Sequence, residues 1–263
     1  MSIFNFFMKK RSKTVEAVTA GAVPNEPIGG ETKNETVEEQ KQEQTTNNAS
    51  ENAKVYNLII LDESGSMVSI YQEALTGVNE TLQTIRMAKE DHPGQEHFVT
   101  LIAFDTGHYN EIYNSTPAEE AVDIMPEQYR PGGATPLYDA MGRAISDLRN
   151  HLANKEDYVV LVTVITDGYE NASREYSGPA IKALVKEMRN KGWVFTYIGA
   201  NQDVDSVAES MSINNSMAFC STTEGTKEMF LKEKMARMRF YGKIRCRKSI
   251  SKEDFEDDFF GDA

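Results

Sequence analysis

The sequence of 263 residues has little cysteine, no long apolar run and far fewer positive than negative charges. Only Cys220 and Cys246 occur, far apart in the chain, which fits the reducing cytoplasm better than a disulfide-stapled secreted domain. No window approaches the roughly 20 apolar residues that span a bilayer. The formal net charge of −13 argues against nucleic-acid binding, which needs a basic face, and favours cations as ligands.

The first 54 residues lack the composition of a folded domain. Residues 12–54 contain no aromatic side chain and are rich in Glu, Gln, Asn, Thr and Lys, so we expect a disordered acidic linker. Residues 1–11, MSIFNFFMKKR, place apolar side chains ahead of three cations, the reverse of a secretory signal. They are compatible with a weak contact to a membrane surface, with a short partner-docking motif, or with a featureless terminus.

Residues 55–241 alternate between strand and helix patterns. Short apolar runs that stop at turns predict strands at 55–61, 98–104, 109–113, 158–165, 193–198 and 216–219. Apolar residues at helical spacing predict helices near 75–85, 137–152, 181–188, 204–211 and 228–241. This order predicts one α/β domain, with a doubly wound, mostly parallel central sheet flanked by helices.

Residues 242–263 turn basic, then acidic and aromatic, and end in DFEDDFFGDA. Blocks of like charge at a terminus are usually solvated, so we expect a charged and disordered tail. Phe255, Phe259 and Phe260 among acidic residues are also compatible with a short docking motif.

Polar residues follow two of the predicted central strands. Asp62 ends the first strand, with Ser64 and Ser66 close behind it, and Asp167 follows the most apolar strand in the chain. Thr135 lies in a Gly-Gly loop just before a predicted helix. Ligands of open α/β sheets bind beyond the carboxyl ends of the strands, so we expect these five side chains to converge.

Two carboxylates and three hydroxyls, without imidazole or thiolate, suit a hard cation such as Mg²⁺ or Mn²⁺. If neutral hydroxyls coordinate directly and the carboxylates act through water, the ion stays electron-poor and leaves a position for an anionic ligand. An Asp or Glu side chain of a partner protein would supply that ligand. The sequence therefore predicts a metal-dependent protein-interaction module, an adaptor without enzymatic activity.

The strings DESGS, GGATP and ITDG, in this order, resemble the metal-ion-dependent adhesion site of von Willebrand factor A domains. The resemblance covers about Val55 to Phe219 and implies that the five residues hold the metal, the hydroxyls directly and the carboxylates often through water. It gives Glu63 no ligand role. The longer strings RPGGATPLYDA, ITDGYENAS and YIGANQD look most like stand-alone bacterial and phage members, including those associated with tellurium-resistance clusters.

Five further polar residues follow strands that should neighbour the site: Asn171, Ser173, Asn201, Gln202 and Asp203. They are candidates for hydrogen bonds to metal-bound waters or to a partner. Turns and helix caps select the same residue types, so a purely local role is equally compatible.

Two other functions remain open from the sequence. A magnesium-dependent, phosphatase-like hydrolase would use Asp62 as its nucleophile, although Ser64 stands where that chemistry needs a second Asp as general acid. Alternatively, the tails carry the binding and the folded domain is a scaffold between them.

Overall fold

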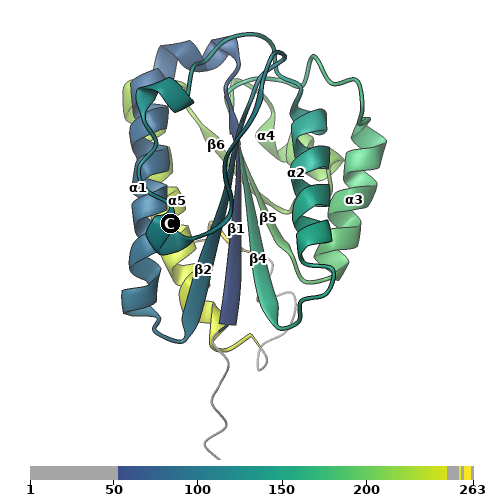
Figure 1. Ribbon diagram of the computed structural model, residues 1–263. Coiled ribbons are helices and arrows are strands. Elements are labelled where there is room, and N and C mark those ends of the chain that lie inside the picture. The colour runs from purple at the N-terminus through teal and green to yellow at the C-terminus, as the bar shows by residue number, and fades with distance from the viewer. Residues whose placement is uncertain (1–52, 248–254, 256–257, 262–263) are drawn as a thin grey trace, which may run out of the picture. The chain divides into compact units, whose positions relative to one another are not determined.

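The computed structural model describes residues 53–247, 255 and 258–261 (Figure 1). The predictions for residues 1–11 and for the acidic linker fall at positions 1–52 and so lie outside the described residues; of the linker only 53 and 54 are described. Within the described ranges, no helix combines the length and the apolar character needed to cross a membrane.

A six-stranded sheet with the order β3-β2-β1-β4-β5-β6 forms the centre of the described fold. Its strands are β1 (Ala53–Asp62), β2 (Gln95–Phe104), β3 (Tyr109–Pro117), β4 (Tyr158–Thr166), β5 (Val194–Ala200) and β6 (Asn215–Phe219). All neighbouring strands are parallel except β2 and β3, which form the expected antiparallel edge hairpin. The prediction of a mostly parallel α/β sheet is confirmed.

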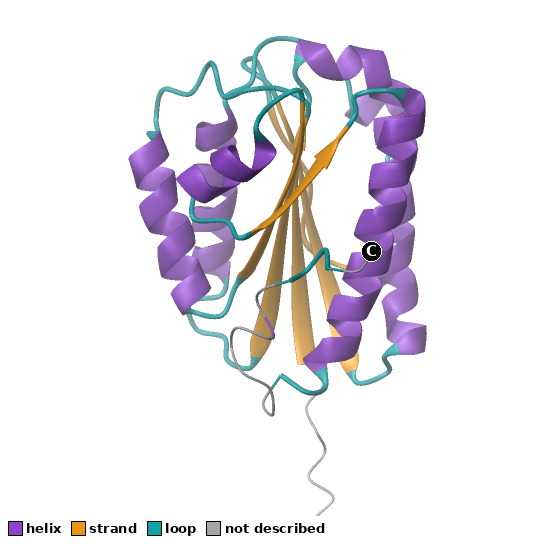
Figure 2. Cartoon of the chain, turned by 180° about the vertical axis from the view of Figure 1, so that it is seen from behind, coloured by secondary structure: helices purple, strands orange, loops and turns teal. Residues whose placement is uncertain are grey.

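Helices cover both faces of this sheet (Figures 1 and 2). The α-helices are α1 (Tyr71–Asp91), α2 (Leu137–His151), α3 (Gly178–Asn190), α4 (Val204–Ser210) and α5 (Thr223–Ile244), and short 3-10 helices are η1 (Gly65–Ile70), η2 (Ala118–Glu120) and η3 (Pro126–Gln128). Alternate side chains of β1 reach the two faces: Ile59 and Leu61 pack beneath α1 and α5, whereas Leu58 and Ile60 pack beneath α2 and α3. Cover on both sides explains the continuous apolar runs of β1 and β4.

Local caps fix the helix ends. The Ser177 side chain accepts from the Ala180 N–H at the start of α3, and Gly192 follows that helix with a positive φ of 85°. The Thr222 side chain accepts from the Gly225 N–H. Because of this cap, α5 begins five residues before the predicted start at Glu228.

Part of the segment 242–263 packs on the fold, which corrects the prediction of a wholly disordered tail. Phe259 is 5% exposed, and its ring centroid lies 5.7 Å from that of Phe240 on α5. The Phe259 N–H also donates to Asn215 Oδ1 at 2.9 Å, and Phe255 packs on the same Phe240 ring. The aromatic side chains find an apolar surface on α5, which the surrounding acidic residues did not reveal. Residues 248–254, 256–257 and 262–263 lie outside the described residues.

The sheet order reverses between β1 and β4. The chain leaves β1 through α1 to reach β2 on one side, whereas β4 pairs with the other side of β1. Adjacent parallel strands whose connections diverge leave room beyond their carboxyl ends, where open α/β folds bind ligands.

Candidate metal centre

Asp62, the last residue of β1, is held rigidly at this position. Its side chain is 0% exposed, and both oxygens accept hydrogen bonds, Oδ1 from the Ser64 N–H at 2.7 Å and Oδ2 from the Thr166 hydroxyl at 2.6 Å. The Tyr129 hydroxyl donates to the backbone carbonyl of Asp62 at 2.9 Å. The carboxylate is therefore fixed by its own loop and by the end of β4.

The two serines connect Asp62 to Asp167. Their hydroxyl oxygens, Ser64 Oγ and Ser66 Oγ, lie 3.1 Å apart, and the Ser66 hydroxyl donates to Asp167 Oδ1. Asp167 Oδ2 accepts from the Ser221 hydroxyl at 3.2 Å. Ser66 is exposed while Ser64 and Asp167 are buried, so the cluster opens to solvent on the Ser66 side.

The loop that carries Thr135 is bonded to both neighbouring loops. Gly65 N–H donates to the Gly133 carbonyl at 3.1 Å, and Thr135 N–H donates to Asn171 Oδ1 at 2.8 Å. Gly133 has a φ of 67°, and a Cβ there would lie only 2.6 Å from Thr106 Oγ1. Only glycine fits this position, which explains why Gly133 stands there.

The oxygens of the three loops face one point beside Gly168. An ideal Cβ on Gly168 would lie 3.3 Å from Thr135 Oγ1, 3.4 Å from Ser66 Oγ and 3.9 Å from Asp62 Oδ2. The structure thus brings the five predicted residues into one cluster, and the absence of a side chain at Gly168 leaves space between them.

This donor set fits a hard divalent cation. In the described part of the chain, no three His, Cys, Asp or Glu side chains gather where they could hold a metal, so a cation here depends on hydroxyl ligands. Hydroxyl and carboxylate oxygens suit Mg²⁺ or Mn²⁺ better than zinc or copper. None of the ion pairs among the described residues involves Asp62 or Asp167, so two neighbouring carboxylates lack a protein cation.

The environment of Asp62 disfavours its ionised form, mainly through burial. Burial raises the pKa of Asp62 to about 6, although hydrogen bonds from Thr166 and Ser64 favour its ionised form, and the charge of Asp167 raises the pKa further. A nearby positive charge is what such a carboxylate pair lacks.

Glu63 turns away from the cluster. It is buried, and its carboxylate accepts from the Arg130 N–H, while its backbone carbonyl accepts from Gly132 N–H at 2.8 Å. These hydrogen bonds hold the loop around Arg130 and Gly132, which leads to Thr135, against the end of β1.

Two of the five flanking candidates contact the site. Asn171 binds Thr135 through its side-chain oxygen, and its own N–H donates to the Thr135 carbonyl at 3.1 Å. Asn201 Nδ2 donates to the backbone carbonyl of Asp167 at 3.3 Å. Both side chains therefore hold the backbone of a predicted metal ligand in place by hydrogen bonds.

The other three make local contacts instead. Asp203 caps α4 by accepting from Ser206 N–H, and Gln202 Nε2 donates to the Tyr197 hydroxyl at 2.8 Å. The Ser173 hydroxyl accepts from Asp139 N–H at 3.0 Å, at the start of α2. Asp203 and Gln202 thus have the local roles that their types also suit, whereas Ser173 joins the loop after β4 to the start of α2.

Three residues at the site were not predicted: Thr166, Ser221 and Tyr129. Thr166 had a signal in the sequence, because it directly precedes Asp167 at the end of the most apolar strand. Ser221 follows the edge strand and Tyr129 lies in a long loop, so nothing in the local sequence placed either beside the cluster.

The sequence profile described as von Willebrand factor type A domain matches residues 58–232. The chain belongs to the von Willebrand factor type A domain family. Domains of this family are generally protein-interaction modules.

Solved structures with a similar fold include the pilus adhesin SpaC from Lactobacillus rhamnosus GG, with 14% identity, a TM-score of 0.49, and coverage of 72% of this chain and 30% of that chain. The von Willebrand factor domain of the type V pili tip protein Mfa5 from Porphyromonas gingivalis has 10% identity, a TM-score of 0.43, and coverage of 70% and 96%. The SpRpn10 domain has 11% identity, a TM-score of 0.46, and coverage of 68% and 94%. The chain thus spans less than a third of SpaC. No curated protein matched the chain.

Proposed function

We propose that this chain is a metal-dependent adaptor that binds an acidic side chain of a protein partner through a divalent cation, held at a metal-ion-dependent adhesion site. The observation that carries this proposal is the convergence of hydroxyl and carboxylate oxygens from three loops on the space beside Gly168. The unmatched charges of Asp62 and Asp167 support it, since a cation would compensate both.

The residues divide into two roles by their chemistry. Ser64, Ser66 and Thr135 would hold Mg²⁺ or Mn²⁺ through their hydroxyls, whereas Asp62 and Asp167 supply negative charge. Asp62 accepts from the Ser64 backbone N–H, and Asp167 accepts from the Ser66 hydroxyl. The bound cation would supply a positive centre that accepts a carboxylate oxygen. The exposed Ser66 side is the side on which a partner has access.

The same geometry favours binding over hydrolysis. A nucleophilic carboxylate must reach the substrate, but Asp62 is fully buried with both oxygens hydrogen-bonded. Ser64, which stands at the position of the general acid, is a far weaker acid than an Asp.

The test is capture of a protein partner on the immobilised full chain, with Mg²⁺ or with a chelator. Capture is expected with Mg²⁺ only, and Ser64→Ala with Ser66→Ala should abolish it without changing the circular dichroism spectrum. Ser206→Ala with Ser210→Ala removes two exposed hydroxyls on α4 and should leave capture unchanged. Equal capture by the Ser64 and Ser66 double variant would refute the mechanism, and capture lost only on deletion of residues 1–52 would favour the scaffold alternative.

The proposal extends to the setting of the protein. The cysteine content supports a cytoplasmic location, and the strings around Thr135, Asp167 and Asn201 support a stand-alone bacterial or phage protein of the kind associated with tellurium-resistance clusters.

A further inference from the structure

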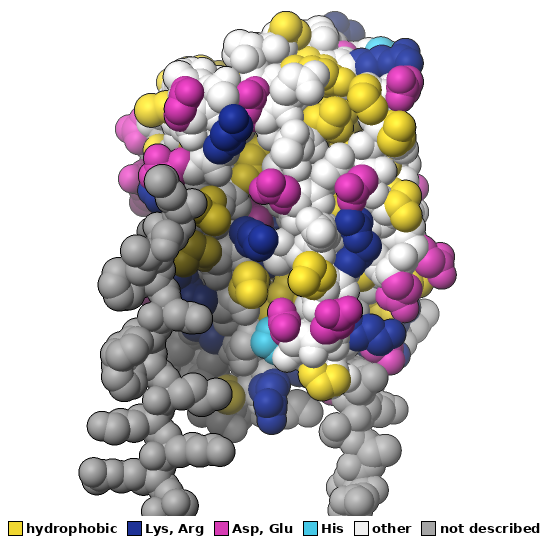
Figure 3. Space-filling view, turned by 90° about the vertical axis from the view of Figure 1, so that its left-hand side faces the viewer, with side chains coloured by type: hydrophobic (Ala, Val, Ile, Leu, Met, Phe, Trp, Pro, Cys, Tyr) yellow, Lys and Arg dark blue, Asp and Glu magenta, His cyan; other side chains and the backbone are white. Residues whose placement is uncertain are grey.

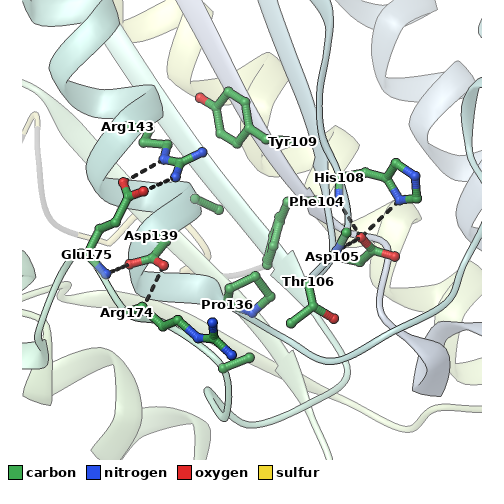
Figure 4. A pocket seen from close by; sticks show the side chains of 13 residues that line it. Phe104, Asp105, Thr106, His108, Tyr109, Pro136, Asp139, Arg143, Arg174 and Glu175 are labelled. Atoms are coloured by element: carbon green, nitrogen blue, oxygen red, sulfur yellow. Dashed lines mark hydrogen bonds and ion pairs between the residues drawn. The ribbon is translucent and has the colours of Figure 1, made fainter.

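A cavity of about 380 Å³ lies beside the candidate metal centre (Figure 4). Its walls come from the turn between β2 and β3, the first turns of α2 and the loop after Gly168. The rings of Phe104, Tyr109 and Pro136 contribute apolar surface, and Arg143 and Arg174 contribute guanidinium groups.

One loop separates the cavity from the metal centre. Pro136 lines the cavity and directly follows Thr135, whose hydroxyl faces the space beside Gly168. Thr106, another cavity residue, holds the same loop: its hydroxyl accepts from Ala134 N–H at 2.8 Å, and its own N–H donates to the Ala134 carbonyl at 3.2 Å. Because this loop borders both places, the cavity adjoins the candidate metal centre.

The carboxylates of the cavity wall are satisfied by the protein itself. Both oxygens of Glu175 accept from Arg143, from Nε at 2.9 Å and from Nη2. Both oxygens of Asp139 accept from backbone N–H groups of Arg174, Glu175 and Tyr176 at 2.8 Å. Burial opposes ionisation of Asp139, but these hydrogen bonds outweigh it and lower its pKa. Neither carboxylate needs a cation from outside.

Asp105 is likewise engaged with its own turn. Its Oδ1 accepts from Gly107 N–H at 2.6 Å and from His108 N–H at 2.7 Å. Figure 4 shows its carboxylate turned toward His108 and away from Arg143 and Arg174.

Several hydrogen-bond donors of the cavity wall, by contrast, have no acceptor among the described residues. The Arg174 side chain makes no hydrogen bond or ion pair with any described residue, and Figure 4 shows it beside Pro136, reaching toward Thr106. Arg143 uses Nε and Nη2 for Glu175, which leaves Nη1, and its guanidinium lies 5.7 Å from the centroid of the Tyr109 ring. The buried Tyr109 hydroxyl also lacks a hydrogen-bond partner among the described residues.

Two of the three cavity carboxylates are hydrogen-bonded on both oxygens, the third is turned toward His108, and the guanidinium groups have spare donors, so the cavity is complementary to an anion. We propose that it is a second carboxylate subsite, in which Arg174 and Arg143 bind an acidic side chain that neighbours the one held at the metal centre. The inference rests on the proposed function and sharpens it: the partner presents two acidic residues close together in one segment.

Synthetic peptides test this directly on the full chain with Mg²⁺. The probes are acetyl-Glu-Gly-Glu-amide and acetyl-Glu-Gly-Gly-Glu-amide, each compared with the two versions in which one Glu is replaced by Gln, and affinity is measured by NMR titration. At least one two-Glu peptide is expected to bind about 5-fold more tightly than its single-Glu versions, as one solvent-accessible charged hydrogen-bonding contact allows.

Arg174→Gln should remove this advantage, and Arg174→Lys should retain part of it because it keeps the charge. The matched control is Arg245→Gln, an equal change of charge at the opposite end of the sheet, beside Ala53. It should leave the advantage unchanged.

The outcomes separate this inference from the proposed function. Metal-dependent binding that does not distinguish the peptides, or an advantage that survives Arg174→Gln, overturns the second subsite alone. Binding that is unchanged by a chelator and by Ser64→Ala with Ser66→Ala overturns the proposed function, and failure of every peptide to bind overturns both.

Discussion

The polar cluster beneath α5 and the candidate metal centre both involve β1 and β4, but their charges are matched differently. Beneath α5, Arg237 is 0% exposed and donates to Glu233 Oε1 at 2.7 Å, to Asn57 Oδ1 at 3.0 Å and to Thr163 Oγ1 at 2.9 Å. The Tyr241 hydroxyl also donates to Asn57 Oδ1. The opposite charges of Arg237 and Glu233 neutralise each other within this cluster.

The metal centre has no such balance. Asp62 and Asp167 are both acidic, both buried and close to each other, and hydroxyl groups are their side-chain partners. A hydrogen-bonded network with balanced charges holds the fold in one arrangement, whereas unmatched like charges favour the binding of a cation. Side-chain burial alone does not distinguish the two clusters, but the charge balance does, and it is the reason that we propose only the second as a metal site.

The largest effect is expected from breaking the self-contained cluster. Glu233→Gln leaves the buried Arg237 cation without its counter-charge, which should lower the free energy of unfolding by about 3–5 kcal/mol. Urea denaturation measures this. Glu228→Gln on the same helix removes an exposed ion pair with Lys232 and should change the stability by less than about 0.5 kcal/mol. Equal effects of the two variants would contradict a structural role for the buried pair.

A second effect concerns His97, whose ring packs against Tyr241 in the same region. Burial lowers the pKa of His97 to about 3, with smaller contributions from His92 and Arg237, so below its unfolded pKa of 6.5 the unfolded state binds more protons. Stability contributed by neutral His97 is therefore present above pH 6.5 and is lost as the pH falls toward 3, by at most about 1.4 kcal/mol per pH unit.

Unfolding free energies measured across this pH range should show a shallower slope for His97→Gln than for the wild type. An unchanged slope in His97→Gln would show that His97 is not neutral and buried in the native state.

The smallest change in stability is expected at the candidate metal centre. There a substitution should mainly change the stabilisation of the protein by Mg²⁺. Gly168→Ala places a methyl group between Thr135 Oγ1 and Ser66 Oγ, each of which must shift by a few tenths of an ångström. In chelator the variant should lose less than about 1 kcal/mol, but the rise in melting temperature with Mg²⁺ should disappear. Gly94→Ala, where a Cβ meets nothing within 4 Å, should keep that rise.

The order of strands and helices and the five clustered residues could both be predicted from the sequence, because the ends of the apolar runs mark both. Apolar runs stop where Asp62 and Asp167 begin the polar loops, and parallel strands bring their ends to one edge. The charge excess at the site was visible from the residue types as well.

The cluster beneath α5 could not be predicted in this way. Glu233 and Arg237 are four residues apart on a helix, the same spacing as a solvated surface pair, and only the packing of α5 on the sheet buries them. Asn57 lies 180 positions away from Arg237. Ser221 and Phe259 depend on similar distant contacts, which no local pattern specifies.

Titration calorimetry of Mg²⁺ into the full chain tests the central claim most directly. The wild type and the control variant Ser206→Ala with Ser210→Ala should bind one Mg²⁺ with the same affinity, and Ser64→Ala with Ser66→Ala should show no binding. Wild-type affinity in the Ser64 and Ser66 double variant would contradict the account, because the converging hydroxyls would then not be the metal ligands.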